Sequence, residues 1–257
     1  MLSIEGSVAV ITGGGSGIGE AIAKNWVQKG GKVVLGDVMP ESLEKVKGEI
    51  QAMGGEVVTL AGDVTKEADN TALAKLAMDT FGGINLVVPC AGIISDGLFL
   101  APDRETGKIK GKMSLDQFKR VIDINLNGVF LTVRECAEEM INNDCKGLIC
   151  LISSTGSLGT AGQINYSSTK AAMSVMPKVI IAEFFRKKLA HKIRCVAVAP
   201  GYVGTEMVKG MNQKALDRIL ENVPINRLIE PEEVASMIFE LYRNEAVNGE
   251  TYFLHGG

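Results

Sequence analysis

A tyrosine and a lysine in the second half of the chain have the residue types and spacing needed for proton transfer. Tyr166 and Lys170 are four residues apart in a helical pattern, so their side chains share one face of the predicted helix. An ammonium group near a phenol favours the phenolate and makes the phenol a better acid or base near neutral pH. Because such a pair most often lies on a solvated helix surface, its role depends on what else the chain carries.

A glycine-rich segment near the N-terminus has the pattern of a phosphate-binding loop. An apolar strand pattern is followed by the loop residues Gly13, Ser16, Gly17, Ile18 and Gly19, after which a helical pattern begins. Gly13 permits a tight turn, Gly17 lets the backbone approach a pyrophosphate, and Gly19 lets the helix pack on the strand. The helix N-terminus offers free N–H groups to the phosphates. This context favours a dinucleotide site over a tight turn without a ligand.

An aspartate at the end of the second predicted strand indicates which dinucleotide is bound. At this place the Asp37 carboxylate can accept hydrogen bonds from both ribose hydroxyls of an adenosine, and it would repel a 2′-phosphate. Neither the glycine loop nor Val38 supplies an arginine or lysine for that phosphate. We therefore expect NAD as the cofactor. An aspartate that only caps the next helix remains the alternative.

The composition is that of an ordinary globular protein. The 257 residues are 46% hydrophobic and 22% charged, and the net charge is −3, which leaves no basic surplus for a nucleic-acid partner. No apolar run reaches the roughly 18 residues of a membrane span. The N-terminus lacks a signal-peptide pattern, and the five cysteines form no CxxC motif. We expect a cytoplasmic protein without a metal site.

Short β-branched runs alternate with longer helical patterns along the chain. We expect strands at Val8–Thr12, Lys32–Asp37, Glu56–Gly62, Asn85–Val88, Leu148–Ile152, Ile193–Ala199 and Thr251–Leu254. The helices are expected at Gly17–Lys29, Glu41–Met53, Lys66–Phe81, Leu115–Asn142 and Tyr166–Leu189. Strands that are apolar throughout are typical of a parallel sheet buried on both faces. The sequence therefore predicts one α/β domain over residues 1–257, a Rossmann fold with a doubly wound, seven-stranded parallel sheet and helices on both faces.

Taken in order, the motifs resemble those of the short-chain dehydrogenase/reductase family over nearly the whole chain. The matching positions are Thr12–Gly19, Asp63-Val64, Ala91-Gly92, Asn125, Ser154, Tyr166, Lys170, Pro200–Thr205, Arg227–Ala235 and Gly256-Gly257. The resemblance implies that Asp63 and Val64 contact the adenine and that Ala91 and Gly92 let the backbone pass the adenosine. It also implies a turn that contacts the nicotinamide, formed by Pro200, Gly201, Val203 and Thr205.

The resemblance further implies hydride transfer between a secondary alcohol and nicotinamide. Tyr166 would be the acid and base, Lys170 would lower its pKa and bind the nicotinamide ribose, Ser154 would hold the substrate oxygen, and Asn125 would position water in a proton relay. One nearby cation lowers a pKa by about 1–3 units, so we expect the oxidised nicotinamide to supply a second positive charge. The family's common spacing to Tyr166 selects Ser153, whereas counting from the end of the strand selects Ser154.

Two segments near the expected site depart from the family pattern. Pro89-Cys90 stands where the family has Asn-Asn; Pro89 has no N–H for a sheet ladder, and we expect Cys90 to be a small buried filler. The segment Ile93–Met113 is longer than in a typical relative. Its charged part predicts a hairpin that projects into water, with Thr106-Gly107 at the tip. The lysines of this hairpin could alternatively meet the phosphates of an acyl-thioester carrier.

The residues expected around the substrate are largely apolar. A lid is predicted at about 202–220, where Met207, Val208 and Met211 could present an apolar face. We therefore expect an NAD-dependent alcohol dehydrogenase or ketone reductase with a hydrophobic small-molecule substrate. A 3-oxoacyl-thioester reductase, an enzyme that recycles its bound NAD, and a non-catalytic NAD-binding regulatory or scaffold protein are the alternatives. The resemblance suggests a homotetramer or dimer with the helices Leu115–Asn142 and Tyr166–Leu189 at the interface.

Overall fold

A seven-stranded parallel sheet forms the centre of the molecule. The computed structural model describes residues 1–209, 217, 220–221 and 223–257, without the side chains of residues 207 and 209. The sheet order is β3-β2-β1-β4-β7-β8-β9, with every neighbouring pair parallel. The strands are β1 Val8–Thr12, β2 Lys32–Asp37, β3 Val57–Ala61, β4 Leu86–Pro89, β7 Gly147–Ile152, β8 Ile193–Pro200 and β9 Thr251–Leu254. The predicted doubly wound Rossmann architecture is confirmed.

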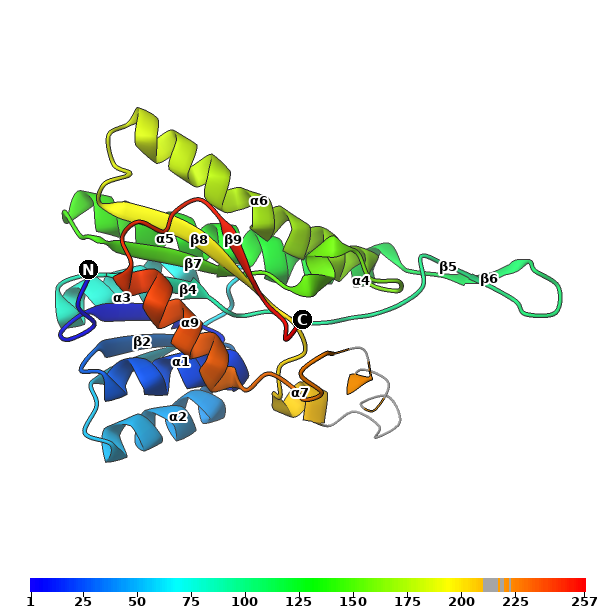
Figure 1. Cartoon of the computed structure of the whole chain (residues 1–257), viewed down its shortest axis with the longest axis horizontal. Helices are drawn as coiled ribbons and strands as arrows, with labels where there is room; N and C mark the ends of the chain where they lie inside the picture. The colour runs from blue at the N-terminus through cyan, green and yellow to red at the C-terminus, as the bar shows by residue number, and fades with distance from the viewer. Residues whose placement is uncertain (210–216, 218–219, 222) are drawn as a thin grey trace.

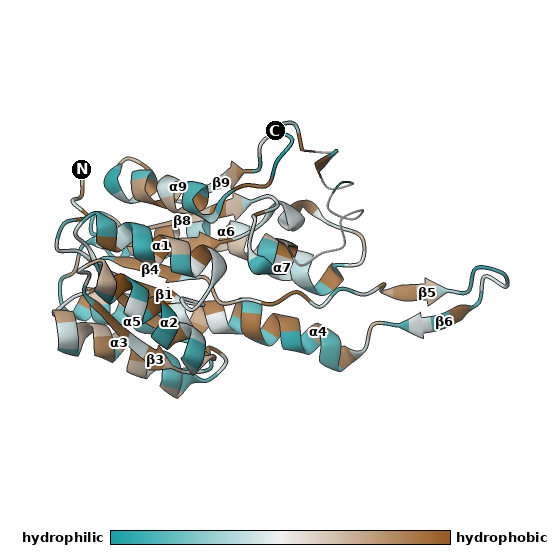
Figure 2. Ribbon diagram, turned by 90° about the horizontal axis from the view of Figure 1, so that it is seen from below, coloured by the Kyte–Doolittle hydropathy of each residue, from teal (hydrophilic) through white to brown (hydrophobic). Residues whose placement is uncertain are grey.

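Helices cover both faces of this sheet (Figure 1). One apolar layer joins the sheet to α1 (Gly17–Gln28), α2 (Pro40–Ala52) and α9 (Pro231–Arg243). The other layer joins it to α3 (Glu67–Phe81), α5 (Gly128–Asn142) and α6 (Ile164–Arg186). Alternate side chains of each strand enter alternate layers, so the central strands are apolar throughout (Figure 2). None of the described helices is both long and apolar enough to cross a membrane.

The order of the strands creates a crevice at their carboxyl ends. Strands β2 and β3 follow on one side of β1, whereas β4 lies on its other side and the chain continues outward from there. The loops after β1 and β4 therefore diverge, and ligands of open α/β sheets bind at such a point of reversal. The glycine loop follows β1, and Ala91-Gly92 follows β4, so the fold brings both predicted cofactor segments to this crevice.

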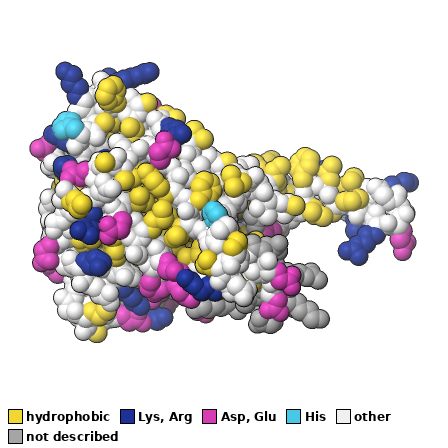
Figure 3. Space-filling view, viewed as in Figure 1, with side chains coloured by type: hydrophobic (Ala, Val, Ile, Leu, Met, Phe, Trp, Pro, Cys, Tyr) yellow, Lys and Arg dark blue, Asp and Glu magenta, His cyan; other side chains and the backbone are white. Residues whose placement is uncertain are grey.

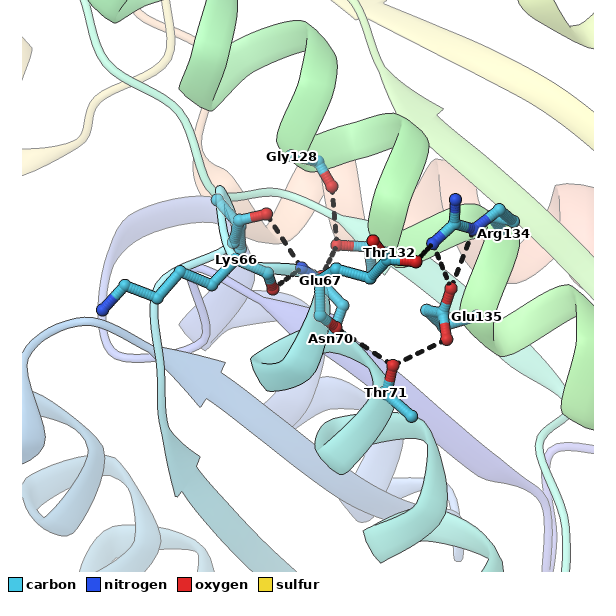
Figure 4. A network of polar contacts seen from close by, with 9 residues as sticks. Lys66, Glu67, Asn70, Thr71, Gly128, Thr132, Arg134 and Glu135 are labelled. Atoms are coloured by element: carbon cyan, nitrogen blue, oxygen red, sulfur yellow. Dashed lines mark hydrogen bonds and ion pairs between the residues drawn. The ribbon is translucent and has the colours of Figure 1, made fainter.

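A polar network fixes the loop after β3 against the second helical layer (Figure 4). The Asn70 amide of α3 donates to the carbonyl oxygens of Val64 and Lys66 at 2.8 Å each. Thr132 of α5 donates to Asn70 Oδ1 at 2.7 Å and lies 2.9 Å from the carbonyl oxygen of Gly128. Because Gly128 has no side chain, Val64 packs directly against the start of α5. The network thus holds Asp63-Val64 at the edge of the crevice.

The predicted helix Leu115–Asn142 is continuous but not uniform. It consists of α4 (Leu115–Ile122), a π-helical turn at Asp123–Asn127, and α5. The π-turn contains Asn125, one of the predicted site residues. Such wide turns inside α-helices often occur at functional sites. The local sequence pattern of an amphipathic helix does not distinguish this turn from an ordinary one.

The long segment between β4 and α4 forms an arm that projects from the body of the molecule (Figure 1). Its strands β5 (Leu100–Pro102) and β6 (Ile109–Lys112) pair only with each other. Asp103 closes the turn by accepting hydrogen bonds from the N–H groups of Glu105 and Thr106, and Gly107 has a positive φ of 68°. Charged side chains gather at the tip, and apolar ones line the stem (Figure 3). The predicted hairpin is confirmed.

Candidate active site

The first two turns of α6 carry the tyrosine and the lysine. The helix begins at Ile164, so Tyr166 and Lys170 stand one turn apart on the same face. Lys170 is buried, and its Nζ lies 5.4 Å from the centre of the Tyr166 ring. The same Nζ donates a hydrogen bond of 2.7 Å to the carbonyl oxygen of Ile152, the last residue of β7. The end of β7 therefore fixes the ammonium group against the tyrosine ring.

Burial controls the proton affinity of both groups. It lowers the pKa of Lys170 to about 8. It raises the pKa of Tyr166, with a hydrogen bond from Ser154 acting in the opposite direction and the Asp96 carboxylate raising the pKa further. The protein groups alone therefore keep Tyr166 in its protonated form at neutral pH, ready to donate a proton. The lowering of the Tyr166 pKa by Lys170 and by the oxidised nicotinamide, expected from the sequence, stays a prediction.

The two serines after β7 occupy different environments. Ser153 is buried, and its Oγ bonds to the carbonyl oxygen of Lys170 and to Ser174 Oγ, at 2.8 Å each. The Ser154 Oγ accepts a hydrogen bond of 3.0 Å from the Gly156 N–H and acts on the Tyr166 phenol. A Cβ placed at Gly156 would lie 3.2 Å from the Tyr166 ring and 3.3 Å from Ser154 Oγ. The structure thus brings Ser154 to Tyr166 and turns Ser153 toward the backbone of α6.

Asn125 is fully buried, and its side chain holds the segment that follows β4. Its Oδ1 accepts from the N–H of Ile93, and its Nδ2 donates to the carbonyl oxygen of Ile93, at 2.8 Å each. The oxygen and the nitrogen of this amide are thereby both paired with the backbone of one residue, Ile93. In this structure the side chain positions the wall of the site, and a role in a proton relay stays a prediction.

The glycine loop makes close contacts that a side chain would prevent. Gly13 and Gly17 have positive φ angles of 65° and 56°. A Cβ at Gly13 would lie 2.8 Å from the nitrogen of Ala91, and one at Gly19 would lie 2.2 Å from the Gly13 oxygen. One at Gly17 would lie 3.1 Å from Thr205. The loop therefore touches both the β4 loop and the predicted nicotinamide turn, as a dinucleotide cradle requires.

The other predicted loop positions border the same cradle. Ser16 stands at the N-terminus of α1 without capping it through its side chain, and Ile18 packs on the first apolar layer. In the turn after β8, which ends at Pro200, Gly201 packs against His255, and Val203 is buried and pairs with Ile229. This anchoring holds Thr205 beside the glycine loop. Part of the lid predicted at 202–220 lies outside the described residues. Met211 and the side chain of Met207 belong to that part.

The Asp37 carboxylate lies between the glycine loop and the start of α2. Its Oδ2 accepts from the Gly15 N–H and its Oδ1 from the Met39 N–H, at 3.1 Å each. Each oxygen keeps a further acceptor position, so the group can still bind two ribose hydroxyls. Because α2 begins at Pro40 with Met39 as its N-cap residue, the bond from Met39 fixes the turn before the helix and does not cap it. The ribose-binding role of Asp37 stays a prediction. Nearby, Asp63 and Val64 line a hollow together with Thr12 and Gly36.

Pro89-Cys90, which replaces the Asn-Asn of the family, does not disrupt the hydrogen bonds of the sheet. Pairing between β4 and β7 covers Leu86 and Val87 and ends before Pro89, so the missing N–H breaks no ladder bond there. On the β1 side the N–H of Cys90 donates to the Thr12 oxygen at 3.2 Å. Burial raises the pKa of the Cys90 thiol to about 11. The thiol therefore stays protonated and packs on the first apolar layer.

Four amide and carboxylate side chains beside the site were not singled out from the sequence. Gln163 and Asn165 hold the segment after β4, which includes Asp96, against the start of α6. Gln117 holds the same segment against the start of α4. The only sequence signal of these four side chains is that Gln163 and Asn165 flank the expected start of the tyrosine helix. The bonds from Asn165 and Gln163 join residues that are 70 and 67 positions apart along the chain, and those from Gln117 join residues 22 and 21 positions apart.

Comparisons with known proteins agree with this geometry. The family model described as short chain dehydrogenase matches residues 7–216. The chain is 31% identical to the 3-oxoacyl-[acyl-carrier-protein] reductase of Thermotoga maritima, over 100% of this chain and 99% of that protein. It is 30% identical to the 2,5-dichloro-2,5-cyclohexadiene-1,4-diol dehydrogenase of Sphingobium indicum, over 99% and 96% of the two chains.

A solved structure agrees as well. A 7α-hydroxysteroid dehydrogenase in complex with NADH and 7-oxo glycochenodeoxycholic acid superposes with a TM-score of 0.88 at 27% identity, covering 99% of this chain and 95% of that one. The expected family and enzyme class are thereby confirmed. The chain belongs to the short-chain dehydrogenase family and is an oxidoreductase that uses a nicotinamide cofactor.

Proposed function

We propose that this protein interconverts a secondary alcohol and a ketone with NAD(H), and that its substrates are largely apolar. The observation that carries the proposal is the meeting of Ser154, Tyr166 and Lys170 at the crevice that the glycine loop borders. A protein that only bound the dinucleotide would need no buried lysine against a tyrosine. The regulatory or scaffold alternative is therefore less well supported.

In the proposed reaction the cofactor supplies or accepts the hydride, and the protein handles the proton. Ser154 donates a hydrogen bond to the substrate oxygen, and Tyr166 gives that oxygen a proton during reduction. The Lys170 ammonium stabilises the phenolate that remains. In oxidation the same groups act in reverse. Asn125 is proposed to serve the proton relay from its π-turn, as well as holding Ile93.

The choice of NAD over NADP rests on Asp37. Its carboxylate lies 3.1 Å from the N–H of Gly15 in the glycine loop, where it would meet the ribose of the adenosine. A 2′-phosphate would bring a second negative charge to the same place, which is strongly unfavourable at close range. The glycine loop carries no arginine or lysine to compensate. We propose that the protein prefers NAD for this reason.

The surroundings of the site support an apolar substrate. Ile94, Leu98, Leu158, Ile164 and Tyr202 are exposed on the segments that border Tyr166 and Ser154. A ligand that covered them would bury apolar surface, the main source of affinity in most small-molecule sites. The lid of residues 202–220 is proposed to close over this region.

A homo-oligomer is proposed from the outer faces of the helices. Phe130 on α5 and Val175, Val179 and Phe185 on α6 are all at least half exposed, which is unusual for large apolar side chains gathered on two neighbouring helices. A dimer or tetramer that buried these faces would explain them. We expect the protein to act in the cytoplasm.

One alternative substrate class has specific support. The Thermotoga maritima relative is named a 3-oxoacyl-[acyl-carrier-protein] reductase. The arm of this protein presents Lys108, Lys110 and Lys112 to solvent, where they are open to the phosphate of such a carrier. Against this, the arm also carries Asp103, which pairs with Lys110 at 3.5 Å. A simple ketone remains the favoured substrate.

The test is NADH oxidation at 340 nm with purified protein and four substrate classes: aromatic ketones, cyclic ketones, sugars and acetoacetyl thioesters. Each assay is repeated with NADPH. The proposal predicts turnover of at least one apolar ketone, with kcat/KM at least tenfold higher for NADH. Turnover confined to thioesters would replace the substrate class, and a preference for NADPH would remove Asp37 as the selector. No turnover with any ketone, while NADH binding is retained, would contradict the proposed reaction.

A further inference from the structure

The segment that follows β4 brings a carboxylate to the active site and holds it there. The carbonyl oxygen of Ser95 accepts from Asn165 Nδ2 at 2.9 Å and from Gln117 Nε2 at 3.0 Å. Gln117 Nε2 also donates to the carbonyl oxygen of Asp96 at 3.0 Å, and the N–H of Gly97 donates to the Gly162 oxygen at 2.8 Å. The backbone on both sides of Asp96 is thus fixed.

The side chain of Asp96 is fixed as well. Its Oδ2 accepts from Gln163 Nε2 at 2.9 Å, and Gln163 occupies the N-cap position of α6. Asn165, which holds Ser95, also accepts from the N–H of Tyr166 at 2.8 Å. The start of α6 therefore positions Asp96 and Tyr166 together. Within the described part of the chain, Asp96 has no ion pair with a lysine or arginine.

The bond from Gln163 places the carboxylate at the start of the helix that carries Tyr166. The centre of the Tyr166 ring lies 5.4 Å from Lys170 Nζ, and Ser154 at the end of β7 and Cys90 at the end of β4 also act on the proton affinity of its phenol. The negative charge of Asp96 raises the pKa of Tyr166 in addition to the larger effect of burial. Asp96 is exposed to solvent, so its carboxylate is open to a ligand.

We infer that Asp96 determines specificity: it accepts a hydrogen bond from a second hydroxyl group of the substrate, so that the preferred substrates are hydroxylated ketones and diols with an otherwise apolar frame. The inference rests on the proposed ketone–alcohol chemistry and names the substrate class within it.

The chemistry of the site supports a donor on the ligand. A carboxylate can only accept hydrogen bonds, and one oxygen of Asp96 is already used by Gln163. Two residues away on either side, Ile94 and Leu98 are exposed apolar side chains, so a ligand at this segment meets a carboxylate between two apolar groups. An anionic group of a substrate at this place would be repelled. A ketone without a hydroxyl would give the second oxygen of Asp96 no hydrogen-bond donor.

The test compares 2-hydroxycyclohexanone with cyclohexanone. The ratio of their kcat/KM values with NADH is measured for the wild type, Asp96→Asn and Asp96→Ala. Glu105→Gln is the matched control, because it removes an exposed carboxylate from the tip of the arm. We expect the wild-type ratio to favour the hydroxyketone and to fall about tenfold or more in both Asp96 variants, as for loss of a hydrogen bond to a charged group. The control should keep the wild-type ratio.

A second measurement needs no turnover. The ionisation of Tyr166 is followed by tyrosinate absorbance as the difference between the enzyme and its Tyr166→Phe variant, since the chain has only four tyrosines. The midpoint should lie lower in Asp96→Asn than in the wild type and be unchanged in Glu105→Gln. An unchanged midpoint and an unchanged substrate ratio would overturn the inference. If the midpoint of Tyr166 ionisation shifts in Asp96→Asn but the wild type reduces no ketone, the proposed function is refuted, and only the position of Asp96 near Tyr166 is supported.

Discussion

Replacing the buried lysine should remove a cost to stability that depends on pH, and should destroy the site. We consider Lys170→Met, measured without cofactor. Methionine retains most of the volume of the side chain and removes the charge. The folded protein lowers the pKa of Lys170 from 10.5 to about 8 because burial disfavours the ammonium. One unit of pKa corresponds to about 1.4 kcal/mol, so the buried ammonium costs about 3 kcal/mol of stability at pH 7.

The direction of the pH dependence follows from proton binding. Between pH 8 and 10.5 the unfolded chain binds this proton more strongly than the folded one, so the stability of the wild type rises with pH through that window. Below pH 8 both states are protonated, and the full cost is present. The methionine variant lacks this dependence. Its advantage over the wild type should therefore shrink by about 2 kcal/mol between pH 7 and pH 9.5.

One structural cost opposes the gain. The variant leaves the Ile152 oxygen without the hydrogen bond that Lys170 donates at 2.7 Å, which removes about 1–3 kcal/mol at every pH. The net effect at pH 7 is then small or stabilising, but the change with pH remains. This change is the decisive quantity, because the lost hydrogen bond does not titrate.

The assay is urea unfolding at pH 7.0, 8.5 and 9.5 for the wild type and Lys170→Met. Lys178→Met is the control, since Lys178 lies on the same helix with a side chain that is 63% exposed. The control should differ from the wild type by the same amount at all three pH values. The account of Lys170 as a buried charge predicts that the unfolding free energies of Lys170→Met and the wild type change relative to each other with pH. It would be refuted if their difference stayed constant, or if it grew in favour of the variant as the pH rises.

Three further predictions concern the other predicted site residues. Asp37→Ala should narrow the preference for NADH over NADPH at least tenfold, measured as the ratio of the two kcat/KM values; an unaltered ratio would mean that another group selects. Ser154→Ala should lower kcat by about 100-fold with little change in stability, whereas Ser153→Ala should lower the unfolding free energy by about 1–2 kcal/mol and retain turnover; the reverse pattern would exchange their roles. Gly19→Ala should abolish NADH binding, measured by fluorescence, because the new Cβ would lie 2.2 Å from the Gly13 oxygen. In the control Gly48→Ala the new Cβ meets open space, and the substitution should stabilise its helix by up to about 1 kcal/mol. NADH binding retained by Gly19→Ala would show that the loop can rearrange.

The strands were predictable because burial on both faces leaves a clear signal. The apolar run Glu56–Gly62 contains β3, Val57–Ala61, and Asn85–Val88 differs from β4 by one residue at each end. The helix Tyr166–Leu189 was predicted with its start two residues late, since Ile164 carries no capping signal. The alternation of strand patterns with helical patterns along the chain also predicts a parallel sheet between two layers of helices.

The amide contacts around Asp96 were not predictable from the sequence. Asn165 and Ser95 are 70 residues apart, and their hydrogen bond exists only because the fold brings the β4 segment to the start of α6. The π-turn at Asp123–Asn127 could not be predicted from the sequence either, because its residues also fit the pattern of an ordinary α-helix. The motifs indicated which residues could react. The three-dimensional structure was needed to show that Ser154 lies by Tyr166 while Ser153 bonds to the Lys170 oxygen, and that burial lowers the pKa of Lys170.

The central claim is that this protein transfers a hydride between NADH and a carbonyl carbon with Tyr166 as the proton donor. The most direct measurement incubates the purified protein with NADH that carries deuterium at both C4 positions and a ketone that it turns over, and analyses the product alcohol by mass spectrometry. The account predicts one deuterium on the carbinol carbon for the wild type, and almost no product from Tyr166→Phe although that variant still binds NADH. Product alcohol without deuterium, or undiminished turnover by Tyr166→Phe, would contradict it.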